Sequence, residues 1–288
     1  MRQGWKIRVW AAMTLGACAV TAFLVYRAYR VPVAVEDAVS TPTLTESGTP
    51  RGNIPAIYEP SFVTVGTADQ YLKDSGLGID VEIAGERRFY PYQILVWHQV
   101  ANDVLGETPI AVTFSPLTYT GIVFDRTVNG RELTFETAPY LWDNHLVMMD
   151  RETASLWVQM LGRAVEGELK DASVTVFPSR VVSWREWKAE YPRGRVLSLE
   201  TGVERDYTLD PYTEYYDTQA IWFPLSHKDD RLPLKTPVYG VVRDGSVIAY
   251  PAELVDEGKV TIEEDTYPLL AYWFAWSSVH PDTELYLP

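Results

Sequence analysis

Two neighbouring stretches of the chain hold side chains that could act together in chemistry. His98, Asn102 and Asp103 lie within six residues of one another, and a hydroxyl-rich loop, Ser115–Thr120, follows them. A histidine next to a serine hydroxyl can serve as a general base or as a ligand. The alternative is a core histidine that donates to a backbone carbonyl, because most buried polar groups only satisfy structure. We therefore consider one hypothetical pocket of catalytic residues, made of His98, Asn102, Asp103, Ser115, Thr118 and Arg126.

These residues depend on one predicted helix and two predicted strands. Pro91–Asp103 is the helix, with Pro91 at its first position, where the missing N–H costs nothing. On this helix His98 lies on the same face as its apolar neighbours, so its side chain points where they point. Ala111–Phe114 and Gly121–Arg126 are the strands, and the hydroxyl-rich loop joins them.

Two acid–base pairs follow apolar segments, at Asp125-Arg126 and Asp150-Arg151. Each pair could clamp a substrate. Neighbouring residues on a strand point to opposite faces, however, and ion pairs often only orient elements, so separate structural roles are favoured.

A second histidine, His145, could join His98 in binding a hard or borderline metal. We favour a surface position for His145, in Asp143-Asn144-His145, over a role as a metal ligand. The sequence contains no HExxH motif, no CxxC pair and no regular spacing of histidines and carboxylates, so we assign no metal ligand. It also lacks GxGxxG, GxxxxGK[ST] and GxSxG, the usual signs of phosphate cradles and of the α/β-hydrolase serine, and no cofactor is indicated.

Short strands and tight turns dominate after Phe62. Asn-Gly and Asp-Gly between alternating arms are the strongest short hairpin signals, because both turn residues need positive φ. Hairpins are predicted around Ala84-Gly85, Asn129-Gly130 and Asp244-Gly245. A second helix is predicted at Trp184–Glu190, where Ser183 and Glu186 have capping-box spacing.

The chain also repeats itself. Val81, Gly85, Tyr90 and Pro91 reappear 160 positions later, and a Trp-x2-Trp-x4-Pro pattern at Trp184 reappears 89 positions later. The offset falls by 71, which predicts a duplication whose second copy lacks about that many residues from its middle. Tryptophans at helical spacing usually face inward, so both pairs are predicted to lie in the core rather than to hold carbohydrate or protein.

The first thirty residues differ from the rest. An uncharged run, Val9–Tyr26, lies between basic residues and would rise roughly 27 Å as a helix, close to the hydrocarbon thickness of a bilayer. We therefore expect a retained, single-pass membrane anchor with the C-terminal domain outside the cytoplasm. Leu15–Cys18 resembles a lipobox, but the apolar residues after Cys18 disfavour lipidation.

Composition limits the function of the remaining chain. All 39 acidic residues but only 20 of the 25 basic ones follow position 30, so this part has a formal charge near −19. Such a surface repels phosphate backbones, and nucleic-acid binding is not expected. Cys18 is the only cysteine, so disulfide and thiolate chemistry are not expected in the exported domain.

Several blocks carry a family resemblance, among them "YPYQILVWHQVANDVLGETPIAVTFSPLTYTGIVFDR", "LVMMDRETASLWVQMLGRAVEGEL" and "FPLSHKDDRLPLKTPVYGVV". From about Ser61 onward the chain resembles an uncharacterised prokaryotic family, domain of unknown function 3179. Typical relatives have a Cys-Pro-Leu-Cys sequence, which suggests metal or redox work in them. Here Ser115 and Thr118 occupy the cysteine positions, and hydroxyls bind soft metals poorly.

Together these patterns predict a β-rich α+β protein with few helices and two related halves, preceded by one transmembrane helix. Residues 1–8 are the predicted cytoplasmic tail, 9–26 the anchor, 27–58 a flexible tether and 59–288 the extracytoplasmic domain, with related halves at about 75–200 and 235–288. We expect a membrane-tethered binding or scaffolding domain with a protein or cell-envelope partner. The alternative is an enzyme or metal-handling protein whose pocket surrounds His98 and the Ser115–Thr120 loop.

Overall fold

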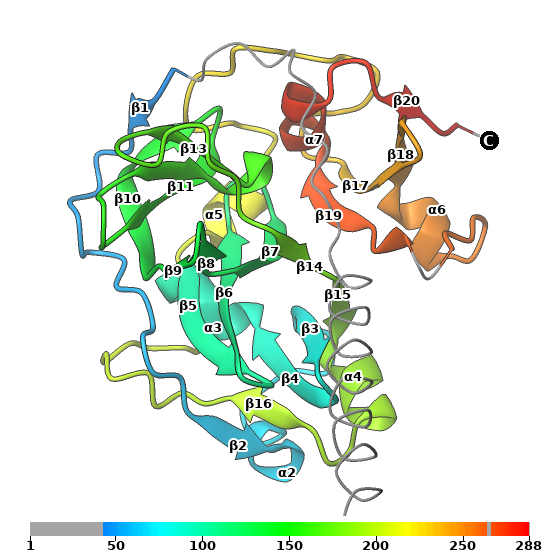
Figure 1. Ribbon diagram of the computed structural model, residues 1–288. Coiled ribbons are helices and arrows are strands. Elements are labelled where there is room, and N and C mark those ends of the chain that lie inside the picture. The colour runs from blue at the N-terminus through cyan, green and yellow to red at the C-terminus, as the bar shows by residue number, and fades with distance from the viewer. Residues whose placement is uncertain (1–42, 264–265, 288) are drawn as a thin grey trace, which may run out of the picture.

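The computed structural model describes residues 43–263 and 266–287 and shows a β-rich protein with short helices (Figure 1). The described strands form four sheets of four or five strands and one two-stranded ribbon. Most strand pairs are antiparallel, so the predicted β-rich class is confirmed. The predicted anchor, residues 9–26, lies outside the described residues. Within the described part of the chain, no helix is long and apolar enough to cross a bilayer.

One small unit occurs twice. The first unit is the sheet β15-β3-β4-β16-β2, with helix α3 after β4 and helix α4 after β15. The second unit, orange and red in Figure 1, is the sheet β19-β17-β18-β20, with α6 after β18 and α7 after β19. The first unit contains β2 (Phe62–Thr64), α2 (Val65–Ala68), β3 (Leu77–Ile83), β4 (Glu86–Pro91), α3 (Tyr92–His98), β15 (Ser179–Ser183), α4 (Trp184–Glu190) and β16 (Arg195–Leu197). The second contains β17 (Pro237–Arg243), β18 (Ser246–Pro251), α6 (Ala252–Asp256), β19 (Leu269–Tyr272), α7 (Trp273–Val279) and β20 (Glu284–Leu285).

The pairing register of the two units agrees residue for residue. Arg195 of β16 lies opposite Arg88 of β4 in a parallel pair. Glu284 of β20 lies opposite Ile248 of β18, also in a parallel pair. Ile248 follows Arg88 by 160 positions and Glu284 follows Arg195 by 89, the two offsets of the sequence repeat. The same offsets relate the antiparallel pairing of β15 with β3 to that of β19 with β17. The repeat in the sequence therefore corresponds to a repeated strand order and register.

An insertion separates the two parts of the first unit. Between α3 and β15 the chain builds the strands of two further sheets, ordered β14-β7-β6-β5 and β10-β11-β12-β13, and the ribbon β8-β9. β1, which precedes the first unit in sequence, pairs with β10 at the edge of the second of these sheets. Between α6 and β19, the described residues of the second unit form no counterpart of these strands, which is the shortening that the falling offset predicted. The elements that form these sheets are β1 (Thr45–Glu46), β5 (Val100–Leu105), β6 (Thr108–Ser115), β7 (Thr120–Asp125), β8 (Thr127–Val128), β9 (Arg131–Glu132), β10 (Phe135–Trp142), β11 (His145–Asp150), β12 (Leu156–Val158), η1 (Gln159–Leu161), β13 (Arg163–Glu166) and β14 (Val176–Phe177). One more short helix, α5 (Thr213–Tyr216), lies between the two units in sequence.

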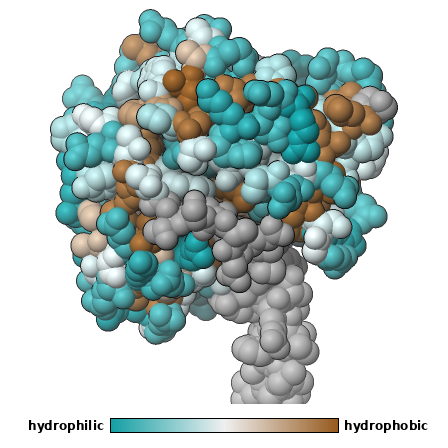
Figure 2. Space-filling model, turned by 90° about the horizontal axis from the view of Figure 1, so that it is seen from above, coloured by the Kyte–Doolittle hydropathy of each residue, from teal (hydrophilic) through white to brown (hydrophobic). Residues whose placement is uncertain are grey.

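Apolar side chains of the insertion and of the second unit share one core cluster. Phe124 and Trp157 of the insertion belong to the same buried cluster as Trp273 and Trp276 of the second unit. Burial of apolar surface is the main stabilising contribution to a fold, so the second unit is held by packing against the insertion. Hydrophilic residues cover most of the face seen from above in Figure 2, with smaller apolar patches between them.

The local predictions hold where short-range signals were strong. The turn residues Ala84, Asn129 and Asp244 all have φ of 51° or 52° and precede glycines with φ of 77° to 81°, so the three predicted hairpins are confirmed. Helix α4 has the predicted bounds, and Ser183 and Glu186 form both hydrogen bonds of a capping box. Both tryptophan pairs are buried, as predicted.

Two predicted boundaries are wrong. The helix expected at Pro91–Asp103 ends at His98, because Gln99 takes a left-handed φ of 59° and Val100 begins strand β5. The tether expected to run to residue 58 ends earlier, since residues 43–58 belong to the folded domain. Ile57, for example, is 1% exposed. Its N–H donates to Val100 O, and its C=O accepts from Asn102 N, both on β5.

The second tryptophan of each buried pair, Trp187 in α4 and Trp276 in α7, donates to one polar side chain and packs against one glycine. In the first unit, Trp187 Nε1 donates to Asp80 at 2.8 Å, and a Cβ on Gly194 would lie 2.3 Å from the indole. In the second unit, Trp276 Nε1 donates to Thr283 at 2.9 Å, and a Cβ on Gly240 would lie 2.2 Å from it. Gly240 corresponds to Asp80 and Thr283 to Gly194 under the repeat offsets. The first unit therefore has the hydrogen-bond acceptor on β3 and the glycine just before β16. The second unit has the glycine on β17 and the acceptor just before β20.

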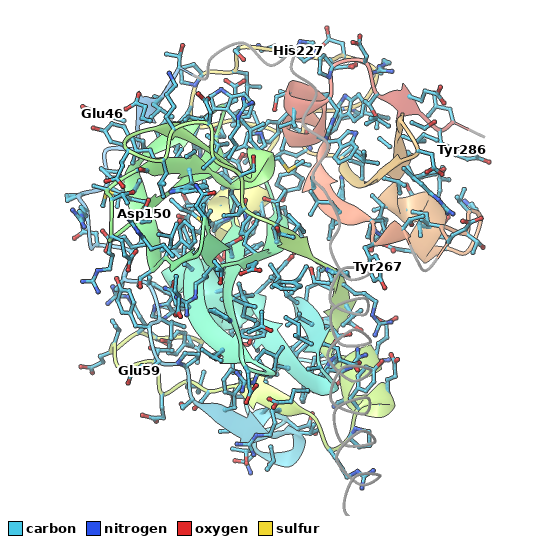
Figure 3. The ribbon with its side chains drawn as sticks, viewed as in Figure 1. Glu46, Glu59, Asp150, His227, Tyr267 and Tyr286 are labelled. Carbon is cyan, nitrogen blue, oxygen red and sulfur yellow. The ribbon has the colours of Figure 1, made fainter. Side chains whose placement is uncertain are left out.

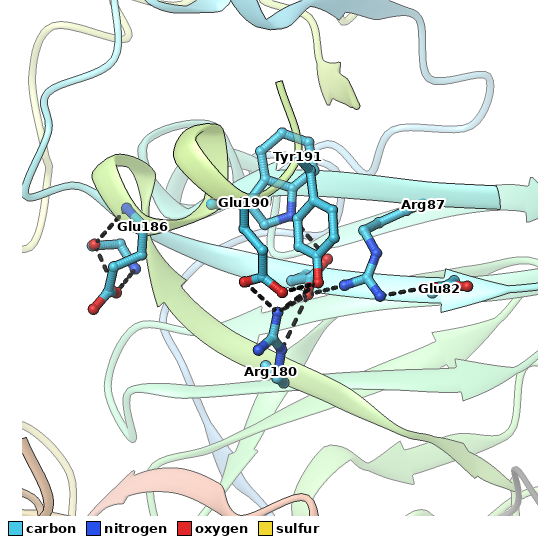
Figure 4. A network of polar contacts seen from close by, with 9 residues as sticks. Glu82, Arg87, Arg180, Glu186, Glu190 and Tyr191 are labelled. Atoms are coloured by element: carbon cyan, nitrogen blue, oxygen red, sulfur yellow. Dashed lines mark hydrogen bonds and ion pairs between the residues drawn. The ribbon is translucent and has the colours of Figure 1, made fainter. Parts of the chain in front are cut away.

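The polar partner in the first unit belongs to a larger network of charges (Figure 4). Asp80 is 2% exposed and accepts from Arg87 at 2.6 Å and from Arg180 at 2.9 Å. Arg180 continues to Glu190 at 3.3 Å, and the Arg87 guanidinium lies 3.9 Å from the centre of the Tyr191 ring. A buried carboxylate needs such compensation. The network therefore has a sufficient structural role in joining β3, β15 and α4.

Candidate functional site

A cavity of about 140 Å³ lies beside the hydroxyl-rich loop. Ser115, the last residue of β6, contributes one wall together with Pro116 and Leu117. Further walls come from β10, from residues 47–54 and from the stretch that contains Tyr212 and Trp222. Among the described residues, none that lines the cavity carries a charged side chain. Its polar and aromatic lining consists of Ser47, Thr49, Gln99, Ser115, Thr137, Tyr140, Tyr212, Trp222 and Phe223.

A chain of hydroxyl and amide groups runs from this cavity into the core. Thr118 Oγ1 donates to Ser115 Oγ at 2.7 Å and lies 2.8 Å from Thr120 Oγ1. Thr120 Oγ1 donates to Gln159 Oε1, and Gln159 Nε2 donates to Thr113 Oγ1, both at 2.8 Å. A hydroxyl has one hydrogen, so Thr118 and Thr120 use theirs inside the chain. The Ser115 hydrogen has no acceptor among the described residues and remains available to the cavity.

Gln99 connects α3 to β5 and lines the same cavity. Its Nε2 donates to the hydroxyl of Tyr212 at 3.1 Å, whereas its Oε1 accepts no hydrogen bond within the described part of the chain. Both Gln99 and Tyr119, in the hydroxyl-rich loop, have a left-handed φ of 59°. That conformation costs a non-glycine residue roughly 1–3 kcal/mol, and such residues cluster at functional sites.

Thr137 adds an unused hydroxyl to the cavity wall. Its Oγ1 is buried and has no hydrogen-bond partner in the described residues. The register of β10 against β11 shifts between Thr137 and Leu141, so the strand is irregular where it lines the cavity. Such irregularities re-aim side chains and are frequent near binding sites. At this irregular strand the Thr137 hydroxyl is satisfied by none of the described groups.

His98 lies apart from this cavity. It is fully buried, its Nδ1 lies 2.7 Å from Pro55 O, and its Nε2 lies 2.7 Å from the Tyr207 hydroxyl. Because a carbonyl only accepts, Nδ1 carries the hydrogen and Nε2 accepts from the tyrosine. Burial lowers the pKa of His98, which keeps the ring neutral. Within the described chain no hydrogen bond joins it to the Ser115–Thr120 loop.

Asn102 and Asp103 lie on β5 rather than at a helix end. Asn102 donates to Phe135 O and accepts from Phe135 N, both at 2.8 Å, and so fastens β5 to β10. Asp103 pairs with Arg88. Asn102 lies opposite Ala111, four residues along β6 from Ser115, or about 13 Å at ~3.3 Å per residue.

Arg126 bonds the backbone around Asp103, near the start of β6 and at the opposite end of that strand from Ser115. Its guanidinium donates to the backbone carbonyls of Ile110, Leu133 and Asp103 at 2.6–3.3 Å and pairs with Glu132 at 2.9 Å. The structure thus divides the six predicted site residues. Ser115 and Thr118 share a hydrogen bond at the cavity, and Asp103 meets Arg126 in another place. His98 and Asn102 are each fixed by partners of their own.

Other residues singled out from the sequence, among them Asp150, Asn144 and His145, have structural partners. Asp150 (Figure 3) is fully buried and accepts from Trp157 Nε1 at 2.8 Å. The surface position favoured for His145 is wrong, since its side chain is fully buried, lies 3.0 Å from Ser278 Oγ, and has its pKa lowered by burial to about 3. Asn144 exchanges two hydrogen bonds at 3.1 Å with the backbone of Phe223. In the described residues no group of three His, Asp, Glu or Cys is placed to hold a metal.

Of the polar and aromatic residues that line the cavity, only Ser115 was a candidate from the sequence. Gln99, Thr137 and Trp222 are among those that sequence reasoning missed. Gln99 was placed inside a helix, because no glycine or proline marks the position where the helix ends. Thr137 and Trp222 carry no local signal, because only the fold brings β10 and the stretch after α5 beside Ser115.

Comparison with known proteins gives a family and nothing more specific. No curated protein and no solved structure matches the chain. A family model described as protein of unknown function (DUF3179) matches residues 51–270, which include the strands between α3 and β15, the cavity residues from Gly52 onward, and β17, β18 and α6 of the second unit. The chain therefore belongs to the DUF3179 family.

Proposed function

We propose that this protein is a binding module, tethered to the outer face of a prokaryotic cell membrane, that holds a small uncharged polar molecule beside the Ser115–Thr120 loop. One observation carries the proposal. Within residues 43–263 and 266–287, the Ser115 hydroxyl hydrogen has no acceptor and the buried Thr137 hydroxyl has no partner, and both residues line one cavity. An unsatisfied buried polar group costs about 1–3 kcal/mol, so a ligand that satisfies it gains that amount.

The chemistry of the cavity favours binding over catalysis. Ser115 accepts a hydrogen bond from Thr118, and neither a carboxylate nor an imidazole lines the cavity among the described residues. A serine nucleophile needs an adjacent base. The enzyme alternative relied on His98 reaching this loop, and His98 bonds Pro55 and Tyr207 instead.

The tether is proposed from the sequence. The uncharged run Val9–Tyr26 between basic residues supports a single-pass anchor. Residues 47–54, which line the cavity, follow that anchor closely in sequence. A ligand held there would sit next to the point where the chain leaves the domain toward the membrane. A cell-envelope component is therefore the partner we propose.

The test is native mass spectrometry of the full chain, expressed in its own host and purified in detergent. We expect a retained small molecule on the natural protein and its loss from Thr137→Val, which removes the unpartnered hydroxyl without changing the side-chain shape. Thr134→Val is the matched control, because Thr134 is half-buried at the edge of β10 and does not line the cavity. Absence of any bound molecule, or equal retention by Thr137→Val, would overturn the proposal.

A further inference from the structure

We infer that the molecule held in this cavity is one ring of a neutral saccharide, stacked against Trp222 at the cavity wall. This inference rests on the proposed function and names its ligand class. It follows from four properties of the cavity: its size, its lack of charge, its unused hydrogen-bonding groups and its aromatic wall.

Size and charge set the first limits. A cavity of about 140 Å³ is close to the ~150 Å³ apolar cavity that accommodates one benzene molecule, so it has room for the six ring atoms of one sugar unit, whose substituents would extend out of it beside the exposed Trp222. Since none of its described lining residues is charged, an ionised ligand would lose its hydration without a counter-charge. These two limits favour an uncharged ring.

The unused polar groups match neighbouring hydroxyls. Ser115 offers a hydrogen, the Oε1 of Gln99 offers lone pairs, and Thr137 offers both. A sugar hydroxyl both donates and accepts, so adjacent hydroxyls of one ring can serve a mixed set of this kind. A purely apolar ring would leave Thr137 unsatisfied, and a ligand with acceptors alone would leave Gln99 Oε1 unused.

The aromatic wall supplies the surface for the other face of the ring. Trp222 is 51% exposed, and its ring stacks on Tyr212 with centroids 5.8 Å apart and planes at 26°. Tyr215 holds the indole from the side, edge-on at 5.0 Å. The face of an aromatic ring is electron-rich and attracts the polarised C–H groups of a pyranose. Asn144 bonds both backbone groups of the next residue, Phe223, so the indole is presented from an anchored backbone.

The experiment is isothermal titration of the full chain in a detergent without a sugar headgroup, since a maltoside would compete. The probes are methyl glucoside, methyl galactoside and N-acetylglucosamine, with glucuronic acid and glucosamine as charged counterparts. We expect at least one neutral probe to bind and the charged counterparts to bind at least tenfold more weakly. Trp222→Ala is expected to weaken binding about tenfold. Tyr286→Ala is the control, because Tyr286 is another exposed aromatic, at the far end of the second unit (Figure 3).

Failure of this inference is distinguishable from failure of the proposed function. No binding of any neutral probe, or undiminished binding by Trp222→Ala, would overturn the saccharide. If native mass spectrometry then finds a retained molecule whose mass is not that of a sugar, the proposed binding function is supported and the saccharide inference is refuted. If it finds no retained molecule, both the proposed function and the saccharide inference are refuted.

Discussion

Replacing Gly240 by alanine tests whether Trp276 packs directly against Gly240, at the position where the first unit has the hydrogen-bond acceptor Asp80. Gly240 lies within β17, and a Cβ there would lie 2.2–2.4 Å from three carbons of the Trp276 ring. The ring cannot easily move, because it is 2% exposed and its Nε1 is bonded to Thr283. Overpacking of a tight core costs typically 1–3 kcal/mol. We expect Gly240→Ala to destabilise the protein by about 3 kcal/mol.

The assay is urea unfolding of the full chain in detergent micelles, followed by tryptophan fluorescence and circular dichroism. An unchanged slope with a lower midpoint would mean that stability alone has changed. Gly66→Ala is the control, since Gly66 lies in helix α2 with nothing within 4 Å of the added Cβ and is expected to gain about 0.4–1 kcal/mol.

A double-mutant cycle isolates the clash. Trp276→Leu removes the ring atoms that the new Cβ meets, so Gly240→Ala should cost much less in that background, with a coupling of about 0.5–3 kcal/mol. If Gly240→Ala changed stability by less than about 0.5 kcal/mol, or if the two substitutions were additive, the proposed packing of the second unit would be refuted.

Two more predictions concern pH and the hydroxyl-rich loop. Burial lowers the pKa of His280 to about 4. Between pH 6.5 and that value His280 is protonated in the unfolded chain but not in the folded one, so the free energy of unfolding falls as the pH is lowered. This residue should contribute a loss of about 2 kcal/mol between pH 7 and pH 5. His280→Phe retains a ring that can stack on Trp276 and should reduce that loss in urea titrations at pH 7 and pH 5; an unchanged pH dependence would contradict the assignment. In a Cys18→Ser background, Ser115→Cys with Thr118→Cys should oxidise to an intramolecular disulfide, because the two oxygens already lie 2.7 Å apart. Intact mass should fall by about 2 Da on oxidation, and a pair that stays reduced would show that the loop is arranged differently.

The sequence by itself determined the parts of this protein that short-range physics controls. Glycine-containing turns must take positive φ, which placed the three hairpins, and a capping box placed helix α4. The repeat offsets determined the two related units and the missing middle of the second, because a duplicated unit retains its register. The block pattern also determined the family.

Only the tertiary structure decided where the candidate site lies. His98 is the last residue of helix α3, and its ring nitrogens bond Pro55 and Tyr207 rather than Ser115. The cavity residues come from five separate stretches of chain that meet through the pairing of distant strands and through aromatic packing. Those contacts depend on sequence separations far beyond one helical turn or one hairpin, so no local pattern encodes them. An unpartnered hydroxyl such as that of Thr137 becomes visible only when every neighbour is in place.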